Sequence, residues 1–378
     1  MGRTFDVAFQ GGGARGIVLN GALERLEKGG HRVGRVVGTS AGAIAASLVA
    51  TGFTAEEMVT MSRERRADGL PEFAEYVMDV PTAPEDVRAS GLYAMLLGAE
   101  RSMHVPEGAA ERVAEHLGSW LAGVPGVRSS FSFLERGGLH SGAGFTGWFA
   151  RTLESKRAGL ATVTLGALAE LTGRDLTIVA TDTTAARMIV LNHRTAPRVP
   201  LVQAVRMSMS IPLFFEEVVW RADWGTYLGE DISGHVIVDG GVLSNFPLRF
   251  VLPDASESVR AFMGEPPRDG ATPLGLHIDP TLEVIGAPPG AHSPQSPVLS
   301  CVQHTRLARR VMALVETMLD GNDDTTEETH RSAICALPAK GYWATEFHME
   351  AERVDALIAA GGRAMGAHLD RLESGASR

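Results

Sequence analysis

Cysteine, lysine and long apolar runs are all scarce in this chain of 378 residues. Its two cysteines, Cys301 and Cys335, are too few for a disulfide framework and lack the Cys-x-x-Cys spacing of redox and zinc sites. No segment approaches the ~18 consecutive apolar residues that a membrane-spanning helix needs. The N-terminus also lacks the apolar run of a secretory signal peptide. We therefore expect a cytoplasmic protein, with peripheral contact at membranes or signal-independent export left open.

Basic residues are also fewer than acidic ones. The chain has 35 Lys and Arg residues against 45 Asp and Glu residues, for a formal net charge of −10. Such a surface repels phosphate groups at long range, so nucleic acid is not an expected partner. The histidines and carboxylates show neither the His-Glu-x-x-His spacing of zinc sites nor a calcium-loop pattern, so we expect no metal and no other cofactor.

The composition is otherwise that of a globular protein, with 44% hydrophobic and 21% charged residues. A strand-like run over 4–10 is followed by a glycine cluster and by an apolar helical pattern over 15–28. A second short strand at 35–37, a tight turn at 38–42 and an Ala-rich helix at 43–51 repeat this order. Two successive strand–turn–helix units predict a parallel sheet with helices on its faces.

The rest of the chain continues this mixed pattern. Residues 54–160 are mostly helical, and we interpret them as a helical insert or lid. Further strands are predicted at 175–181, 187–192, 235–239 and 273–278, with a helix at 200–210. The Pro- and Gly-rich segments 253–273 and 280–297 are expected to be surface loops, and core-facing helices are expected at 301–319 and 352–372.

These elements place the chain in the α/β class. We expect a three-layer α/β/α sandwich with a mostly parallel central sheet and a helical lid or cap region. A single catalytic domain would span residues 4–373, with its motifs inside 5–250 and a loop-rich, helical C-terminal part at 253–373.

The first cluster that carries chemistry is the glycine run Gly11–Gly16 between the first strand and the first helix. Backbone N–H groups at a helix N-terminus attract negative charge, so this loop can cradle an anion. A dinucleotide site would need an acidic residue ~20 positions later, where the chain has Val36, Val37 and Gly38. The loop also lacks the Lys-Ser/Thr ending of a Walker loop. An oxyanion hole for acyl transfer suits the run better.

Two further motifs follow strands. Gly38-Thr39-Ser40-Ala41-Gly42 matches Gly-x-Ser-x-Gly between a strand and a helix, the context in which the glycines allow a sharp turn that presents the Ser40 hydroxyl. Asp239-Gly240-Gly241 closes the predicted strand 235–239. An Asp at such a position is commonly only a turn former.

Taken together and in this order, the three motifs resemble the patatin-like phospholipase family, over roughly residues 5–250. The likeness extends to the segment from Arg206 through Ser208 to Pro212 and, more loosely, to residues 137–142. The resemblance implies a Ser–Asp dyad, with Ser40 as nucleophile and Asp239 as base. It also implies an oxyanion hole built from the loop residues Gly11, Gly12, Gly13, Ala14 and Arg15.

The dyad implies acyl transfer in two steps through an acyl-enzyme, and Asp239 serves as the base in both. With its ordinary pKa of ~3.9, an Asp is a weak base at pH 7. We therefore expect its effect to come from direct hydrogen bonding to the Ser40 hydroxyl, together with stabilisation of the same transition state by the oxyanion hole, rather than from basicity.

Two alternatives remain open at this point. His277 follows Asp239 in the chain order of an α/β-hydrolase triad, which makes a Ser–Asp–His esterase or lipase possible. In the other, the glycine loop merely holds a nucleotide or another phosphate, and Ser40 lies in a passive turn.

The family resemblance points to phospholipids or other glycerolipids as substrates, and protein partners are unknown. The apolar stretch 92–97 is our candidate for a lid or membrane-facing patch, with core packing as its alternative. Arg15 and Arg206 are expected near the site, where they could meet lipid phosphate or structural carboxylates, and we favour structural pairing for Arg206.

Overall fold

The computed structural model describes residues 2–67, 71–81, 87–103, 108–253, 256–265, 270–288 and 330–375, with isolated positions between these ranges. Within them, a mixed sheet runs in the order β10-β9-β1-β2-β4-β8-β7, and β5 pairs with β4 off this path. The strands are β1 (Thr4–Phe9), β2 (Arg32–Thr39), β4 (Leu176–Asp182), β5 (Arg187–Leu191), β7 (Val218–Val219), β8 (Val236–Asp239), β9 (Thr272–Glu283) and β10 (Ile334–Lys340). Pairing is parallel from β10 to β4 and antiparallel at β5, β8 and β7.

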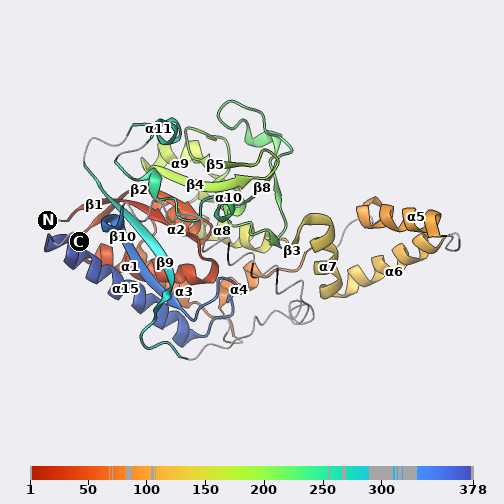
Figure 1. Cartoon of the computed structure of the whole chain (residues 1–378), viewed down its shortest axis with the longest axis horizontal. Helices are drawn as coiled ribbons and strands as arrows, with labels where there is room; N and C mark the ends of the chain where they lie inside the picture. Colours follow the sequence, from red (N-terminus) through yellow and green to blue (C-terminus); the bar gives the residue numbers. More distant parts are fainter. Residues whose placement is uncertain are drawn as a thin grey trace.

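Alternating side chains of the strands enter two separate cores. In β1, Val7 and Phe9 belong to the larger core, whereas Ala8 between them belongs to the smaller one. The larger core is covered by α1 (Ile17–Lys28), α2 (Ala41–Ala50), α3 (Ala55–Arg63), α4 (Glu72–Val77), α8 (Ala143–Lys156), α9 (Leu165–Thr172), α10 (Leu201–Ser208) and α15 (Ala351–Glu373). The smaller core is covered by the short η6 (Leu248–Phe250) and α11 (Glu257–Met263). The predicted three-layer α/β/α sandwich with a mostly parallel sheet is thus confirmed (Figure 1).

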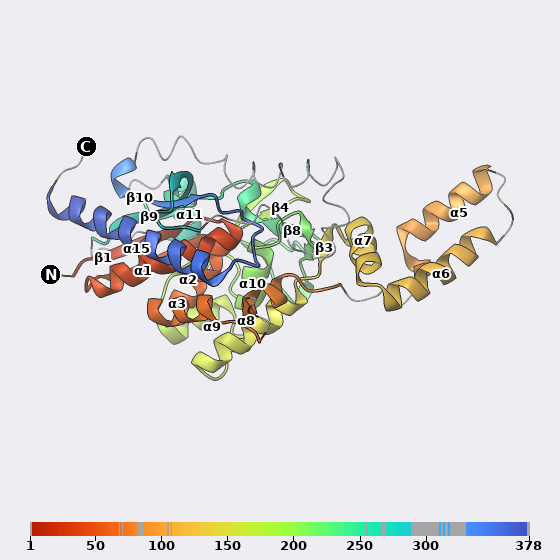
Figure 2. The same cartoon turned by 90° about the horizontal axis from the view of Figure 1, so that it is seen from below.

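The two ends of the chain meet because α1 and α15 pack closely (Figures 1 and 2). A Cβ at Gly21 would lie 1.9 Å from the carbonyl oxygen of Ile358, and one at Gly361 would lie 2.1 Å from that of Val18. Only glycine allows such an approach of two helix backbones. The C-terminal elements β9, β10 and α15 therefore complete the same sheet and core that the N-terminus begins.

Several expectations about the C-terminal third are corrected. The predicted loop 253–273 contains α11, because Ser256 caps a helix whose Val259 and Met263 are buried. The predicted loop 280–297 is wrong over 280–283, where β9 continues as it pairs with β10. Strand β10 was not predicted at all. The expected helix 301–319 lies almost entirely outside the described residues, whereas the helix expected at 352–372 is confirmed as α15.

The predicted insert at 54–160 divides into two parts. Its ends, α3, α4 and α8, pack on the main core. Its middle, α5 (Gly91–Met103), α6 (Ala109–Gly123) and α7 (Pro125–Arg136), extends away from the body as an arm, after which β3 (Gly138–His140) pairs with β6 (Leu213–Phe215) (Figures 1 and 2). The stretch 92–97 lies in this arm and is half-buried or exposed, so it is not part of the main core. Its role as a lid stays a prediction.

Candidate active site

Ser40 stands at the junction of β2 and α2 in a strained conformation. Its φ of 53° lies in the left-handed region, which side chains other than glycine rarely adopt. A Cβ at Gly38 would approach the Gly42 carbonyl oxygen to 2.2 Å, and one at Gly42 would approach the Phe9 carbonyl oxygen to the same distance. The two glycines of the motif are therefore required for the turn to close around Ser40.

The sheet brings Ser40 and Asp239 to the same level although 198 positions separate them. Thr39 at the end of β2 pairs with Val179 of β4, and the next residue of β4, Ala180, pairs with Asp239 at the end of β8. Strand β4 thus bridges the two motifs. Ser40 and Asp239 are 2% and 1% exposed, so bulk water is largely excluded from both.

The environment of Asp239 makes it a much stronger base than an ordinary carboxylate. Burial raises its pKa to about 7, against smaller lowering effects of the Gly241 N–H and the Ser40 hydroxyl. Oδ1 accepts a hydrogen bond from the Gly241 N–H at 2.7 Å. The Ser40 hydroxyl is close enough to lower the pKa of this carboxyl, but Oδ2 accepts no hydrogen bond of standard geometry from the described residues.

The end of α10 holds both motifs in place. Ser208 Oγ accepts a hydrogen bond from the Ser40 N–H at 2.9 Å and donates to the Val179 carbonyl oxygen at 2.6 Å. Two residues later, the Ser210 carbonyl oxygen accepts from the Asp239 N–H at 2.9 Å. Ser208 was predicted only as part of the family-like segment from Arg206 to Pro212, and this role was not assigned to it.

The backbone amides of the glycine loop differ in their availability. Gly11, Ala14 and Arg15 donate to the carbonyl oxygens of Asn245, Ala344 and Gly12 at 3.0, 2.7 and 3.1 Å. For the amides of Gly12 and Gly13, no acceptor is found in the described part of the chain. Only glycine fits at position 13, because the φ of Gly13 is 54° and a Cβ there would lie 2.1 Å from the Ala344 carbonyl oxygen.

Asn245 links this loop to the Asp239 motif. Its side-chain amide donates to the Gly11 carbonyl oxygen at 3.2 Å, and its backbone carbonyl oxygen accepts a hydrogen bond from the Gly11 N–H. The residue is buried and lies six positions after Asp239. A Cβ at Gly240 would lie 2.4 Å from the Val179 carbonyl oxygen, so the motif glycine allows this chain segment to approach β4. Asn245 was not predicted, because its only signal in the sequence is its place shortly after the motif.

Comparison with known proteins identifies the family. The family model described as patatin-like phospholipase matches residues 7–252, about two thirds of the chain, and includes all three motifs. This chain belongs to the patatin-like phospholipase family. Membership supports a lipid hydrolase.

Relatives and solved structures that are similar to this chain align with different shares of it. YqhO of Bacillus subtilis (strain 168) is 30% identical over 367 residues, which cover 95% of each chain. The NTE family protein Mb2594 of Mycobacterium bovis is 31% identical over 107 residues, 28% of this chain and 18% of its own. Among solved structures, VipD from Legionella pneumophila aligns with a TM-score of 0.46 at 15% identity, over 98% of this chain and 67% of its own. ExoU in its complex with SpcU from Pseudomonas aeruginosa aligns with a TM-score of 0.40 at 19% identity, over 98% of this chain and 52% of its own.

The α/β-hydrolase triad does not fit this member of the patatin-like phospholipase family. His277 lies in β9 and Asp239 in β8, and the sheet order separates these strands by four steps. At ~4.8 Å per step, this places the two residues about 19 Å apart, far beyond a hydrogen bond. The His277 ring instead packs against Phe246, with ring centroids 5.2 Å apart.

The two arginines flagged from the family motifs are both buried. Arg206 donates to the Ser141 and Glu216 carbonyl oxygens at 2.8 and 2.7 Å and also to Ser210 Oγ. Burial lowers its pKa to about 10. Arg206 is therefore structural, as we expected, although its direct partners are carbonyl and hydroxyl oxygens rather than carboxylates. Arg15 is 3% exposed, so its side chain is not at the surface where a lipid phosphate would meet it.

Among the described residues, no group of three His, Cys, Asp or Glu side chains is arranged to hold a metal ion. None of the helices in that part of the chain has both the length and the apolar character needed to cross a bilayer.

Proposed function

We propose that this protein hydrolyses carboxylic ester bonds of phospholipids or other glycerolipids, with Ser40 as nucleophile and Asp239 as general base. The observation that carries the proposal is the buried Asp239 carboxyl, with a pKa raised to about 7, beside a serine in a strained turn. A base is most effective when its pKa is close to the working pH. Burial thus supplies the basicity that we did not expect of an aspartate.

The reaction would proceed through an acyl-enzyme. Asp239 takes the proton of the Ser40 hydroxyl while Oγ bonds to the ester carbonyl carbon, and the carbonyl oxygen becomes an oxyanion. The intermediate collapses, the C–O bond to the alcohol breaks, and the alcohol leaves with the proton from Asp239. Water then gives a proton to Asp239 and attacks the acyl carbon, and Ser40 regains that proton as the fatty acid is released.

Within the predicted oxyanion loop, we assign the donor role to the amides of Gly12 and Gly13. This assignment is supported by the other three amides of the loop, because those of Gly11, Ala14 and Arg15 already donate to carbonyl oxygens of the protein. Donors held in place before the reaction are worth most in a site that excludes water.

A lipid surface is the proposed partner during catalysis, contacted through the arm. Met95 and Trp120 are 66% and 58% exposed on α5 and α6, which favours contact with an apolar phase. An ester can reach the buried Ser40 only after neighbouring side chains move, so binding at a surface and opening of the site would be coupled.

The decisive experiment compares wild type with Ser40→Ala and Asp239→Asn on a soluble short-chain ester and on defined phospholipids, with products identified by mass spectrometry. We expect losses of at least about 10³-fold for both variants. A fluorophosphonate probe should label Ser40 in the wild type only. His277→Ala serves as the control and should retain most activity. Wild-type turnover that survives Ser40→Ala, or a serine that the probe never labels, would refute the proposal.

A further inference from the structure

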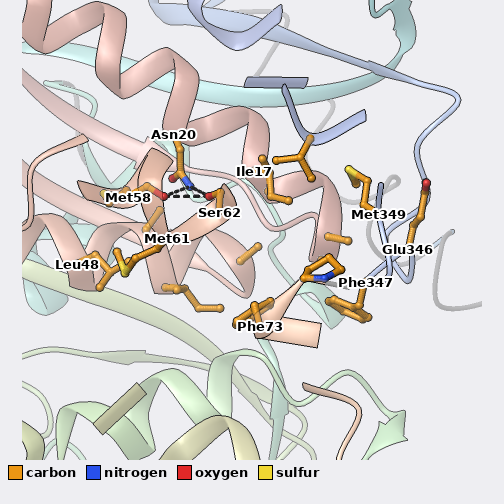
Figure 3. Close-up of a pocket in the computed structure, with 18 of the residues that line it drawn as sticks. Ile17, Asn20, Leu48, Met58, Met61, Ser62, Phe73, Glu346, Phe347 and Met349 are labelled. Carbon is orange, nitrogen blue, oxygen red and sulfur yellow. Dashed lines mark hydrogen bonds between the residues drawn. The ribbon is translucent and has the colours of Figure 1, made fainter. Parts of the chain in front are cut away.

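An apolar cavity of about 120 Å³ lies between α1, α2, α3 and the segment 346–349 (Figure 3). Engineered apolar cavities of ~150 Å³ take up ligands as large as benzene, so this space is large enough for several carbon atoms. One face of α2 forms its wall, with Ala41, Ala45 and Leu48 at successive turns.

One end of the cavity adjoins the proposed catalytic machinery. Gly13 and Ala14 of the oxyanion loop line it, and so does Ala41, the residue directly after Ser40. Phe347 belongs to the same end, because the Ala14 N–H donates at 2.7 Å to the carbonyl oxygen of Ala344, three residues before Phe347. The cavity thus begins one residue from Ser40, beside the loop that we assign to the oxyanion.

Leu48 and Met61 line the other end. The distance along α2 from Ala41 to Leu48 is about 10 Å at 1.5 Å per residue. Figure 3 shows Leu48 and Met61 on the side of the cavity opposite Phe347, together with the hydrogen-bonded side chains of Asn20 and Ser62. A chain that enters beside the oxyanion loop would therefore meet these side chains after about 10 Å.

The polar groups of the wall already have partners within the protein. Asn20 Nδ2 donates to Ser62 Oγ at 2.8 Å, and Ser62 Oγ donates to the Met58 carbonyl oxygen at 2.9 Å. At the other end, Glu346 forms a salt bridge with Arg353 at 2.7 Å. Because these groups need no partner from a ligand, the cavity fits a hydrocarbon chain better than a polar molecule.

We infer that this cavity receives the acyl chain of the substrate, and that Leu48 and Met61 at its far end restrict the enzyme to chains of medium length, such as octanoyl. The inference rests on the proposed function, since it assumes that Ser40 carries the acyl group. Ala45, in the middle of the wall, is the position where added side-chain volume shortens the cavity.

The first test measures kcat/KM for p-nitrophenyl esters from acetate to dodecanoate. Ala45→Leu should lower the ratio of octanoate to acetate activity at least about tenfold, because it occupies the space of several methylene groups. Met61→Ala should move the maximum to longer chains. Ala359→Leu, an equal change on the exposed side of α15, is the control and should leave the ratio unchanged. An unchanged ratio in folded Ala45→Leu would overturn the inference.

The second test does not depend on catalysis. Octanoate binding to Ser40→Ala, measured by calorimetry, should weaken at least about tenfold when Ala45→Leu is added. Equal binding with and without Ala45→Leu refutes the acyl cavity even if the protein is an esterase. Conversely, an octanoate site that responds to Ala45→Leu in a protein without esterase activity refutes the proposed function and keeps the cavity as an aliphatic-chain site.

Discussion

The backbone N–H of Ser40 donates to Ser208 Oγ, and the same hydroxyl donates to the carbonyl oxygen of Val179. One buried side chain thus connects the strained turn after β2 to the neighbouring strand β4. A non-glycine residue with a positive φ costs of order 1–3 kcal/mol and persists only where its surroundings hold it. Ser208 is part of what holds Ser40 in this conformation.

Ser208→Ala should therefore damage the site more than a typical loss of a hydroxyl. The Ser40 N–H and the Val179 carbonyl oxygen would lose a partner in a buried place, which costs about 1–3 kcal/mol of stability. We expect kcat on a soluble ester to fall about tenfold or more as Ser40 shifts. Ser47→Ala in α2 is the matched control, because Ser47 Oγ is buried with no hydrogen-bond partner among the described residues. Equal effects of the two substitutions would contradict the assigned role.

The raised pKa of Asp239 leads to a prediction of how esterase activity depends on pH. Only the ionised carboxylate can accept the Ser40 proton, and burial raises the pKa of Asp239 to about 7. The value of kcat/KM for a soluble ester should therefore rise about tenfold per pH unit below pH ~7 and level off above it. An esterase profile that is flat down to pH ~5, near the range of an ordinary carboxylate, would show that Asp239 is not the base.

The same carboxyl predicts a linked effect on stability. In the unfolded chain Asp239 loses its proton near its ordinary pKa of 3.8, whereas the folded protein keeps it up to about pH 7. Between these values the folded state binds more protons, so the contribution of Asp239 destabilises the protein increasingly as pH rises. At 1.36 kcal/mol per pH unit, the full cost above pH 7 is about 4 kcal/mol.

Asp239→Asn removes this cost because the amide is neutral and its oxygen can still accept from the Gly241 N–H. Urea denaturation at pH 8 should give a larger free energy of unfolding for Asp239→Asn than for wild type. The difference should shrink towards pH 4, where the wild-type carboxyl is also neutral. A less stable Asp239→Asn variant at pH 8 would mean that the carboxylate is stabilised in ways that the fold does not reveal.

Local patterns were sufficient for much of this architecture. The motif turns, the first two strand–helix units and α15 follow from glycine placement and apolar periodicity, which act within a few residues. The unpredicted β10 reads Ile-Cys-Ala-Leu-Pro-Ala-Lys, which lacks the apolar–polar alternation by which a strand is predicted. Burial alternates along β10 only once it pairs with β9.

The missing parts of the site have the same origin. Asn245 and Ser208 belong to the candidate site through hydrogen bonds with residues more than 160 positions away, which no local pattern encodes. The raised pKa of Asp239 likewise depends on complete burial, a property of the assembled sheet and helices. Motif spacing could indicate Ser40 and Asp239, but not the surroundings that set their chemistry.

Two adjacent glycines of α15 test the close packing of the chain ends. Gly361→Ala should destabilise the protein by about 1–3 kcal/mol or more, because its Cβ would lie 2.1 Å from the Val18 carbonyl oxygen and force α1 and α15 apart. Gly362→Ala should be neutral or stabilise by up to ~1 kcal/mol, since its Cβ would meet only the Gly21 carbonyl oxygen, at 3.5 Å. Urea denaturation of both variants checks this. Similar values for the two would show that the helices can separate without cost.

The arm offers the last prediction, which concerns the lipid surface. Met95→Ser and Trp120→Ser remove exposed apolar side chains from α5 and α6, and neither contributes to the main core. If the arm inserts into lipid, the double variant should lose about tenfold or more of its activity on liposomes while its activity on a soluble ester stays within about twofold, because each side chain transferred from water contributes of order 1.5–3 kcal/mol. Val219→Ser, a similarly exposed apolar position on β7 of the body, is the control and should change neither activity.

Liposome sedimentation of the inactive Ser40→Ala protein, with and without the arm substitutions, measures binding directly. Equal losses on both substrates would instead indicate that the arm supports the fold, and unchanged binding would assign lipid contact to another surface.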